Sequence, residues 1–151
     1  MTNKSIAAFL ILTGTIFISS VSYAEVKLPA IFGDHMVLQQ KENVTIWGWA
    51  EPGEEVTVKG SWQRFKKATI ADENGKWKVR IRTRKAGGPH TLTVNGTNEV
   101  VLDDLLIGEV WVGSGQSNME MPLAKISQAY SGIKNAAEEI ANANHPDIRL
   151  F

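Results

Sequence analysis

The sequence contains no cysteine, which excludes a disulfide framework, a thiolate metal site and a cysteine nucleophile. It also has no excess of charge of either sign. Its 16 basic residues are matched by 16 acidic ones, and this balance argues against a nucleic-acid-binding protein. No internal repeat or low-complexity tract is present. With 151 residues, 43% of them hydrophobic and 21% charged, the composition is that of a globular chain with one domain or two small ones.

A long apolar run occurs only at the amino terminus. Lys4 precedes an uncharged apolar stretch from Ile6 to Ile18, which is shorter than the about 20 residues of a membrane-spanning helix. Ser22-Tyr23-Ala24 places small residues at the two positions that a signal peptidase reads. We therefore expect residues 1–24 to be a signal peptide of an exported protein, periplasmic or secreted, with no stable membrane span after cleavage. The alternative is an uncleaved N-terminal anchor.

From residue 25 to residue 106 the hydrophobic pattern has a period of two, which is typical of half-buried antiparallel strands. The clearest case is the segment 77–82, in which three apolar residues alternate with three cations. The pattern predicts that one set points into the core and the other into solvent. The inward set is Trp77, Val79 and Ile81, and the outward set is Lys78, Arg80 and Arg82.

Turn sequences separate these short strands. Pro52-Gly53 favours a tight turn, and Asn74-Gly75 predicts a hairpin between residues 68–71 and 77–82, because both residues tolerate the left-handed conformation. Gly87-Gly88-Pro89 and Asn95-Gly96 predict two more hairpins. Strands spaced in this way indicate a β-sandwich module over residues 25–106, of jelly-roll or immunoglobulin-like type.

The tryptophans of this region allow two interpretations. Trp47 and Trp49 lie on one face of a predicted strand and could stack on a sugar; Trp62 and Trp77 are the others in this region. We expect instead that the indoles fill the core or pack against a neighbouring domain, because each aromatic side chain buries a large apolar area.

The pattern changes after residue 106. Residues 105–107 and 110–112 form a nearly continuous apolar run, which predicts a strand covered on both faces that leads into a loop at 113–119. Apolar residues then recur at helical spacing from Ile133 to Ala141, with Ser131 as a candidate N-cap and Pro146 beyond the end. Residues 148–151 look like a second strand. Strand, loop, helix and strand predict the first unit of an α/β domain over residues 107–151.

The loop contains a candidate nucleophile. A serine hydroxyl needs a sharp turn that exposes it, a base that takes its proton, and donors for the oxyanion. Ser117 follows Gly115-Gln116 at the carboxyl end of the predicted strand, where α/β sheets bind ligands, although Met119 departs from the Gly-x-Ser-x-Gly elbow. From spacing alone, such a loop is more often only a turn. The histidines His35, His90 and His145 are more simply structural or surface residues.

Four blocks of the sequence, taken in order, resemble the amino-terminal part of the sialate O-acetylesterase family, and the resemblance extends over nearly all of residues 25–151. The blocks are Phe32-Gly33-Asp34-His35-Met36-Val37-Leu38-Gln39, Gly48-Trp49-Ala50-Glu51-Pro52-Gly53, Gly87-Gly88-Pro89-His90 and Gly108-Glu109-Val110-Trp111-Val112-Gly113-Ser114-Gly115-Gln116-Ser117-Asn118-Met119. The last block is the most specific, because it carries the nucleophile signature of this branch of the Ser-Gly-Asn-His (SGNH) hydrolases.

The resemblance implies a β-sandwich-like module followed by a flavodoxin-like α/β hydrolase domain that removes O-acetyl esters from sialic acids. Related enzymes deacetylate plant polysaccharides such as xylan. Ser117 matches the nucleophile, and its backbone N–H matches one oxyanion donor. The flanking Gln116 and Asn118 are candidate substrate-binding residues.

The remaining catalytic groups of the family, a histidine with its acidic partner and two further oxyanion donors, belong to a later part of its sequence. We therefore expect an N-terminal fragment of a carbohydrate O-acetylesterase that is inactive by itself and acts on an acetylated carbohydrate, with no metal and no organic cofactor. The alternatives are a non-enzymatic carbohydrate-binding accessory module and a fragment of an acetylxylan-type esterase.

Overall fold

The computed structural model describes residues 25–127, 130 and 132–150. The predicted signal peptide, Ser131 and Phe151 lie outside the described residues. Seven strands precede a 3₁₀ helix, η1 (Ser117–Glu120), and a short helix, α1 (Ala136–Asn142). The strands are β1 (Val37–Gln39), β2 (Asn43–Trp49), β3 (Glu55–Gly60), β4 (Lys67–Ile70), β5 (Lys76–Arg82), β6 (Gly87–Asn95) and β7 (Glu99–Gly108).

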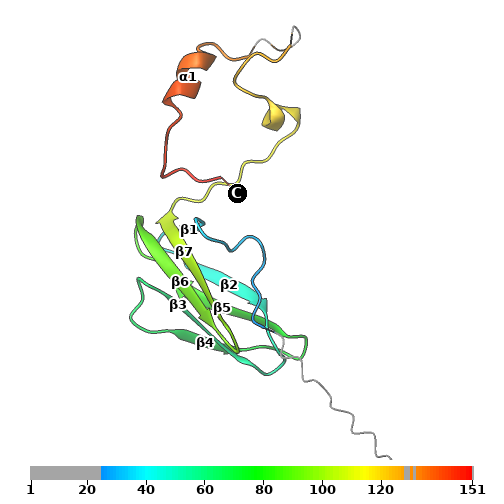
Figure 1. Cartoon of the computed structure of the whole chain (residues 1–151), viewed down its shortest axis with the longest axis vertical. Helices are drawn as coiled ribbons and strands as arrows, with labels where there is room; N and C mark the ends of the chain where they lie inside the picture. Colours follow the sequence, from blue (N-terminus) through cyan, green and yellow to red (C-terminus); the bar gives the residue numbers. More distant parts are fainter. Residues whose placement is uncertain (1–24, 128–129, 131, 151) are drawn as a thin grey trace, which may run out of the picture.

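The strands form two sheets (Figure 1). One has five strands in the order β1-β7-β6-β3-β4, and the other has the two strands β2 and β5. The pairing is antiparallel except between β1 and β7, which run parallel with Val37 opposite Leu106. The prediction of a β-rich fold is therefore confirmed, with one parallel pair in the module that was predicted to be antiparallel.

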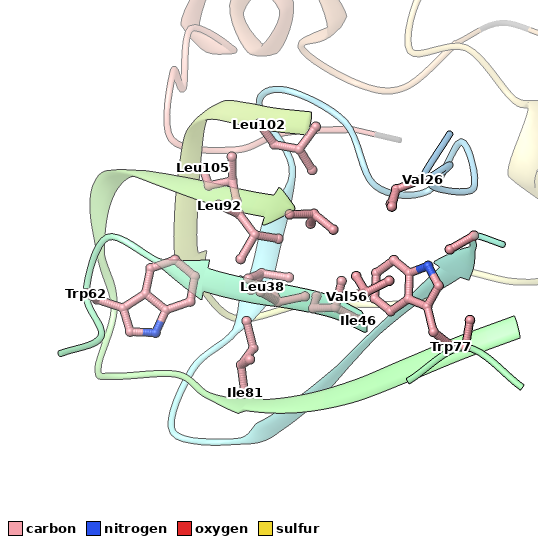
Figure 2. Close-up of a cluster of buried hydrophobic side chains, with 14 of the residues drawn as sticks. Val26, Leu38, Ile46, Val56, Trp62, Trp77, Ile81, Leu92, Leu102 and Leu105 are labelled. Atoms are coloured by element: carbon pink, nitrogen blue, oxygen red, sulfur yellow. The ribbon is translucent and has the colours of Figure 1, made fainter. Parts of the chain in front are cut away.

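One hydrophobic core receives side chains from both sheets (Figure 2). Ile46 and Ile81 come from the two-stranded sheet, and Leu92 and Leu105 come from the five-stranded sheet; all four are fully buried. Trp62 and Trp77 lie at opposite ends of this cluster. The register predicted for residues 77–82 is confirmed, because Trp77 and Ile81 are buried, Val79 is partly buried, and the three cations are exposed.

Two of the predicted hairpins are wrong. Asn74-Gly75 does form a turn, in which Gly75 N–H donates to the Asp72 carbonyl at 2.9 Å, but β4 and β5 belong to different sheets. Gly87-Gly88-Pro89 lies inside β6 rather than between strands. In both cases the chain crosses between the sheets, and a local turn signal carries no information about which sheet receives the next strand. Asn95-Gly96 does close the predicted hairpin, between β6 and β7.

The region after β7 differs from its prediction. Residues 105–107 belong to β7, which continues to Gly108 past the predicted boundary after residue 106. Residues 110–112 form no strand, and Trp111 and Val112 are 88% and 91% exposed. Residues 148–150 form no strand either. A strand that is apolar on both faces needs other elements packed on each face. The described residues provide no such elements around 110–112 or 148–150.

The predicted helix is present but short. It begins after Asn135, whose backbone is left-handed (φ 65°), and it ends at Asn142, before Pro146 as expected. None of its residues is buried, and Ile133 and Ile140 are exposed. The predicted helix is therefore confirmed over residues 136–141 but not at 133–135, and its apolar face packs against no core among the described residues.

Candidate active-site loop

Ser117 is the first residue of η1, on the segment that leaves the end of β7. Figure 1 shows this segment extending away from the two sheets and returning to them near residue 150. Gln116 and Ser117 are exposed, and Asn118 follows within the same helical turn. The three predicted site residues thus lie on one turn of the chain, at which Gln116 and Ser117 are exposed.

Met119 and the glycines define the shape of this turn. The Met119 N–H donates to the Gln116 carbonyl at 2.9 Å. A Cβ added at Gly115 would lie 3.0 Å from Met119 Cγ, and one added at Gly113 would lie 3.3 Å from Met119 Cε. Both glycines therefore make room for the methionine side chain, which packs back on the loop. This contact accounts for a methionine where the Gly-x-Ser-x-Gly elbow has its second glycine.

The Ser117 side chain has no hydrogen-bond partner in the described part of the chain, and so no general base is in place. His35 instead pairs with Asp104, at 2.7 Å between Nδ1 and Oδ2. His90 Nδ1 lies 3.4 Å from Ser61 Oγ, and its ring contacts Trp62. The side chain of His145 is exposed. These positions agree with the interpretation of the three histidines as structural or surface residues.

The start of the loop is attached to the first resemblance block by a carboxylate–amide cluster. Glu109 accepts hydrogen bonds from Gln39 Nε2 at 2.8 Å and from Gln40 Nε2 at 2.6 Å. Gln39 Oε1 accepts from the Val110 N–H at 2.8 Å. The hydrogen bonds from Gln39 and Gln40 lower the pKa of Glu109, because they stabilise its charged form. No sequence motif points to this cluster, although Gln39 and Glu109 lie in the first and the last of the blocks that carry the resemblance.

The end of the segment is attached to the same edge of the module. Arg149 donates to the His35 carbonyl at 2.9 Å, to the Asp104 carbonyl, and through Nη2 to Asp104 Oδ2 at 3.0 Å. The hydrogen bond from His35, and then that from Arg149, lower the pKa of Asp104. The segment that carries Ser117 is thus fastened at both ends beside the β1–β7 pair.

The aromatic side chains on β2 are not in the core. Trp47 and Trp49 are 40% and 41% exposed, so the first of the two expectations, that the indoles fill the core, is wrong for them and confirmed for Trp62 and Trp77. The second, that they pack against a neighbouring domain, stays a prediction. The reason is the register of β2, which turns Ile46 and Gly48 inward and both indoles outward. The two indoles line a cleft of about 630 Å³ on the two-stranded sheet.

The described residues contain neither a metal-binding cluster nor a membrane-spanning helix. Within ranges 25–127 and 132–150, no group of three histidine or acidic side chains is arranged to hold a metal ion. Across the described part of the chain, no helix has the length and apolar character needed to cross a bilayer.

Comparison with known proteins gives related enzymes but no matching family model. A Mus musculus protein named sialate O-acetylesterase is 34% identical over 138 residues, which cover 83% of this chain and 24% of the relative. The Homo sapiens protein of that name is 33% identical over 121 residues, 74% of this chain and 23% of the relative. The chain thus spans about a quarter of the length of these relatives.

A solved structure is similar as well. The crystal structure of a carbohydrate acetylesterase from Xanthomonas citri matches with a TM-score of 0.62 and 39% sequence identity. The match covers 66% of this chain and 23% of that chain.

Proposed function

The chain belongs to the sialate O-acetylesterase family, whose amino-terminal portion it matches, and we propose that it is the amino-terminal part of an exported carbohydrate O-acetylesterase with Ser117 as nucleophile. The observation that carries the proposal is the identity of 33–39% to proteins named sialate O-acetylesterase or carbohydrate acetylesterase. In this proposal, the two-sheet module is the family's sandwich, and residues 107–151 open its flavodoxin-like SGNH domain. Residues 1–24 direct export.

The reaction is transfer of an acetyl group from a sugar hydroxyl to water. The Ser117 oxygen attacks the ester carbonyl carbon while a base takes the hydroxyl proton, and the resulting oxyanion accepts a hydrogen bond from the Ser117 backbone N–H. The C–O bond to the sugar breaks as the sugar oxygen is protonated. Water then attacks the carbonyl carbon of the acetyl-serine while the base takes a proton from it. The bond from this carbon to the Ser117 oxygen breaks, the serine oxygen is protonated, and acetate leaves. The exposed position of Ser117 on a glycine-shaped turn supports its role, because the substrate can reach it.

We assign the general base, which takes the proton of the Ser117 hydroxyl, to the part of the relatives that this chain does not cover. The described histidines support this assignment, since His35 is paired with Asp104 and none of the three makes a hydrogen bond with Ser117. In this proposal the described residues supply a nucleophile and one oxyanion donor but no activating group for Ser117, and the 151-residue chain is inactive by itself.

The experiment compares this chain with a longer protein, in which the chain is followed by the region that the relatives contain and this chain does not. The longer protein should hydrolyse 4-nitrophenyl acetate and react with a fluorophosphonate probe at Ser117. Ser117→Ala should lower the rate by on the order of 10⁴-fold or more, because the other catalytic groups act through the nucleophile. Ser114→Ala, on the same exposed loop, is the matched control and should keep most of the activity.

Two results would contradict the proposal. Full activity of the Ser117→Ala variant would show that another group is the nucleophile. Labelling of Ser117 in the 151-residue chain would show that these residues already supply a base. Acetate release from O-acetylated sialic acid and from acetylated xylan, measured side by side, decides between sialate O-acetylesterase and acetylxylan-type activity.

A further inference from the structure

The outer face of the β2–β5 sheet combines open indoles with lysines. Trp47 lies opposite Lys78, and Trp49 lies opposite Lys76, so the four side chains leave the same face of the sheet. The cleft between them extends to Ile70 on β4 and, at about 630 Å³, is of the size that holds small ligands. This face is separate from the loop that carries Ser117.

The indoles are held in place and remain about 40% exposed. Phe32 contacts Trp47 edge-on at 6.1 Å between ring centroids, and Trp47 contacts Trp49 edge-on at 5.5 Å. The backbone of Trp49 is fixed by two hydrogen bonds with Lys27, at 2.8 and 2.9 Å. No lysine of the described residues lies over either indole, because the cation–π contact found among them joins Arg64 to Phe65. The aromatic surface is therefore preorganised and open to a ligand.

A row of cations continues from this aromatic cluster along β5. The outward side chains of the strand are all exposed, and they are Lys76, Lys78, Arg80 and Arg82. At the spacing of a β-strand, such a row is about 20 Å long. No ion pair joins any of the four to a carboxylate in the part of the chain that the structure describes. The carboxylate in the cleft is Asp72, and its Oδ1 already accepts the backbone N–H groups of Asn74 and Lys76, each at 2.9 Å.

We propose that this aromatic–cationic face binds an acidic oligosaccharide, independently of Ser117 and of the esterase activity. Indoles offer flat apolar surfaces to the C–H faces of sugar rings, and lysine and arginine bind carboxylates. A neutral sugar would leave the cationic row unused, and the length of the row fits several linked sugars rather than one. A nucleic acid is disfavoured because the whole chain has no net positive charge.

Affinity electrophoresis of the full chain tests the proposal. Polygalacturonate in the gel should retard the chain, and neutral dextran should not. Trp47→Ala combined with Trp49→Ala should weaken binding by about tenfold or more, and Lys76→Gln combined with Lys78→Gln should do the same. The matched control is Lys59→Gln combined with Lys85→Gln, which removes the same charge from exposed positions outside the cleft and should leave binding unchanged. Binding should weaken with added salt, because the cations are exposed.

Four results would overturn the proposal. These are no retardation of the wild-type chain by polygalacturonate, equal retardation by dextran, equal retardation by double-stranded DNA of matched charge, and equal loss of binding in the control variant. Thermal melting of each variant shows that the protein is folded, so that loss of binding is not loss of structure. Because no step uses Ser117, the Ser117→Ala variant should bind as the wild type does, and a failure of the esterase proposal would leave this result unchanged.

Discussion

Replacing Gly48 by alanine should destabilise the β module at the base of the aromatic cluster. Gly48 is buried on β2 between the two outward indoles. A Cβ at this position would lie 2.1 Å from the Lys27 carbonyl oxygen and 3.0 Å from Trp77 Cζ2. A carbon and an oxygen atom in contact are about 3.3 Å apart or more. The Lys27 backbone must therefore move by about an ångström, and Trp77, which is buried in the core, cannot easily yield instead.

The magnitude follows from what this displacement breaks. Lys27 and Trp49 exchange two backbone hydrogen bonds, of 2.8 and 2.9 Å, and each has a net value of about 1 kcal/mol. The neighbouring Val26 is 2% exposed, and partly uncovering it costs about 1 kcal/mol more. Alanine loses less backbone entropy than glycine on folding, and this difference offsets about 0.5–1 kcal/mol of the loss. The net loss in the free energy of unfolding should be about 2 kcal/mol, which lowers the Tm of a module of this size by about 10 °C.

Urea unfolding followed by tryptophan fluorescence measures this difference. Gly33→Ala is the matched control, because a Cβ at Gly33 meets nothing within 4 Å, and it should change the free energy of unfolding by less than about 0.5 kcal/mol. If Gly48→Ala were as stable as Gly33→Ala, the close approach of Lys27 to β2 would not exist in solution. The same result would remove the support for the position of Trp49.

Two further predictions concern the core and the attached segment. Ile81→Ala should cost about 3 kcal/mol in urea unfolding, because this side chain is fully buried, whereas Ile70→Ala, at a position 67% exposed, should cost less than about 0.5 kcal/mol. Hydrogen bonds from His35 and Arg149 lower the pKa of Asp104 in the folded protein below the ordinary aspartate pKa of 3.8. The charged carboxylate therefore stabilises the fold at pH values above 3.8, and this stability is lost as the pH falls through the lowered folded-state pKa. The urea midpoint of Asp104→Asn should therefore vary less with pH than that of the wild type in the acid range; an identical pH profile would contradict the Asp104 contacts.

The sequence by itself predicted the alternating β structure of residues 25–106 and pointed to the Ser117 loop as the candidate site. Alternation along β5 was sufficient to orient Trp77, Ile81 and their neighbours, because successive side chains of a strand leave opposite faces whatever the strand pairs with. The block around Ser117 was sufficient for the family resemblance, since it specifies residue types rather than distant contacts. Both are properties of a few consecutive residues.

Tertiary structure alone decided which strands share a sheet and which side chains meet. The turn at Asn74-Gly75 was predicted from local chemistry, but only long-range packing directs β4 into one sheet and β5 into the other. Trp47 and Trp62 have the same side chain, yet one lies outside and one inside, because burial depends on which face of a strand or loop meets the second sheet. The bonds from Gln39 and Gln40 to Glu109 join positions about 70 residues apart in sequence, and no local pattern encodes such a pairing.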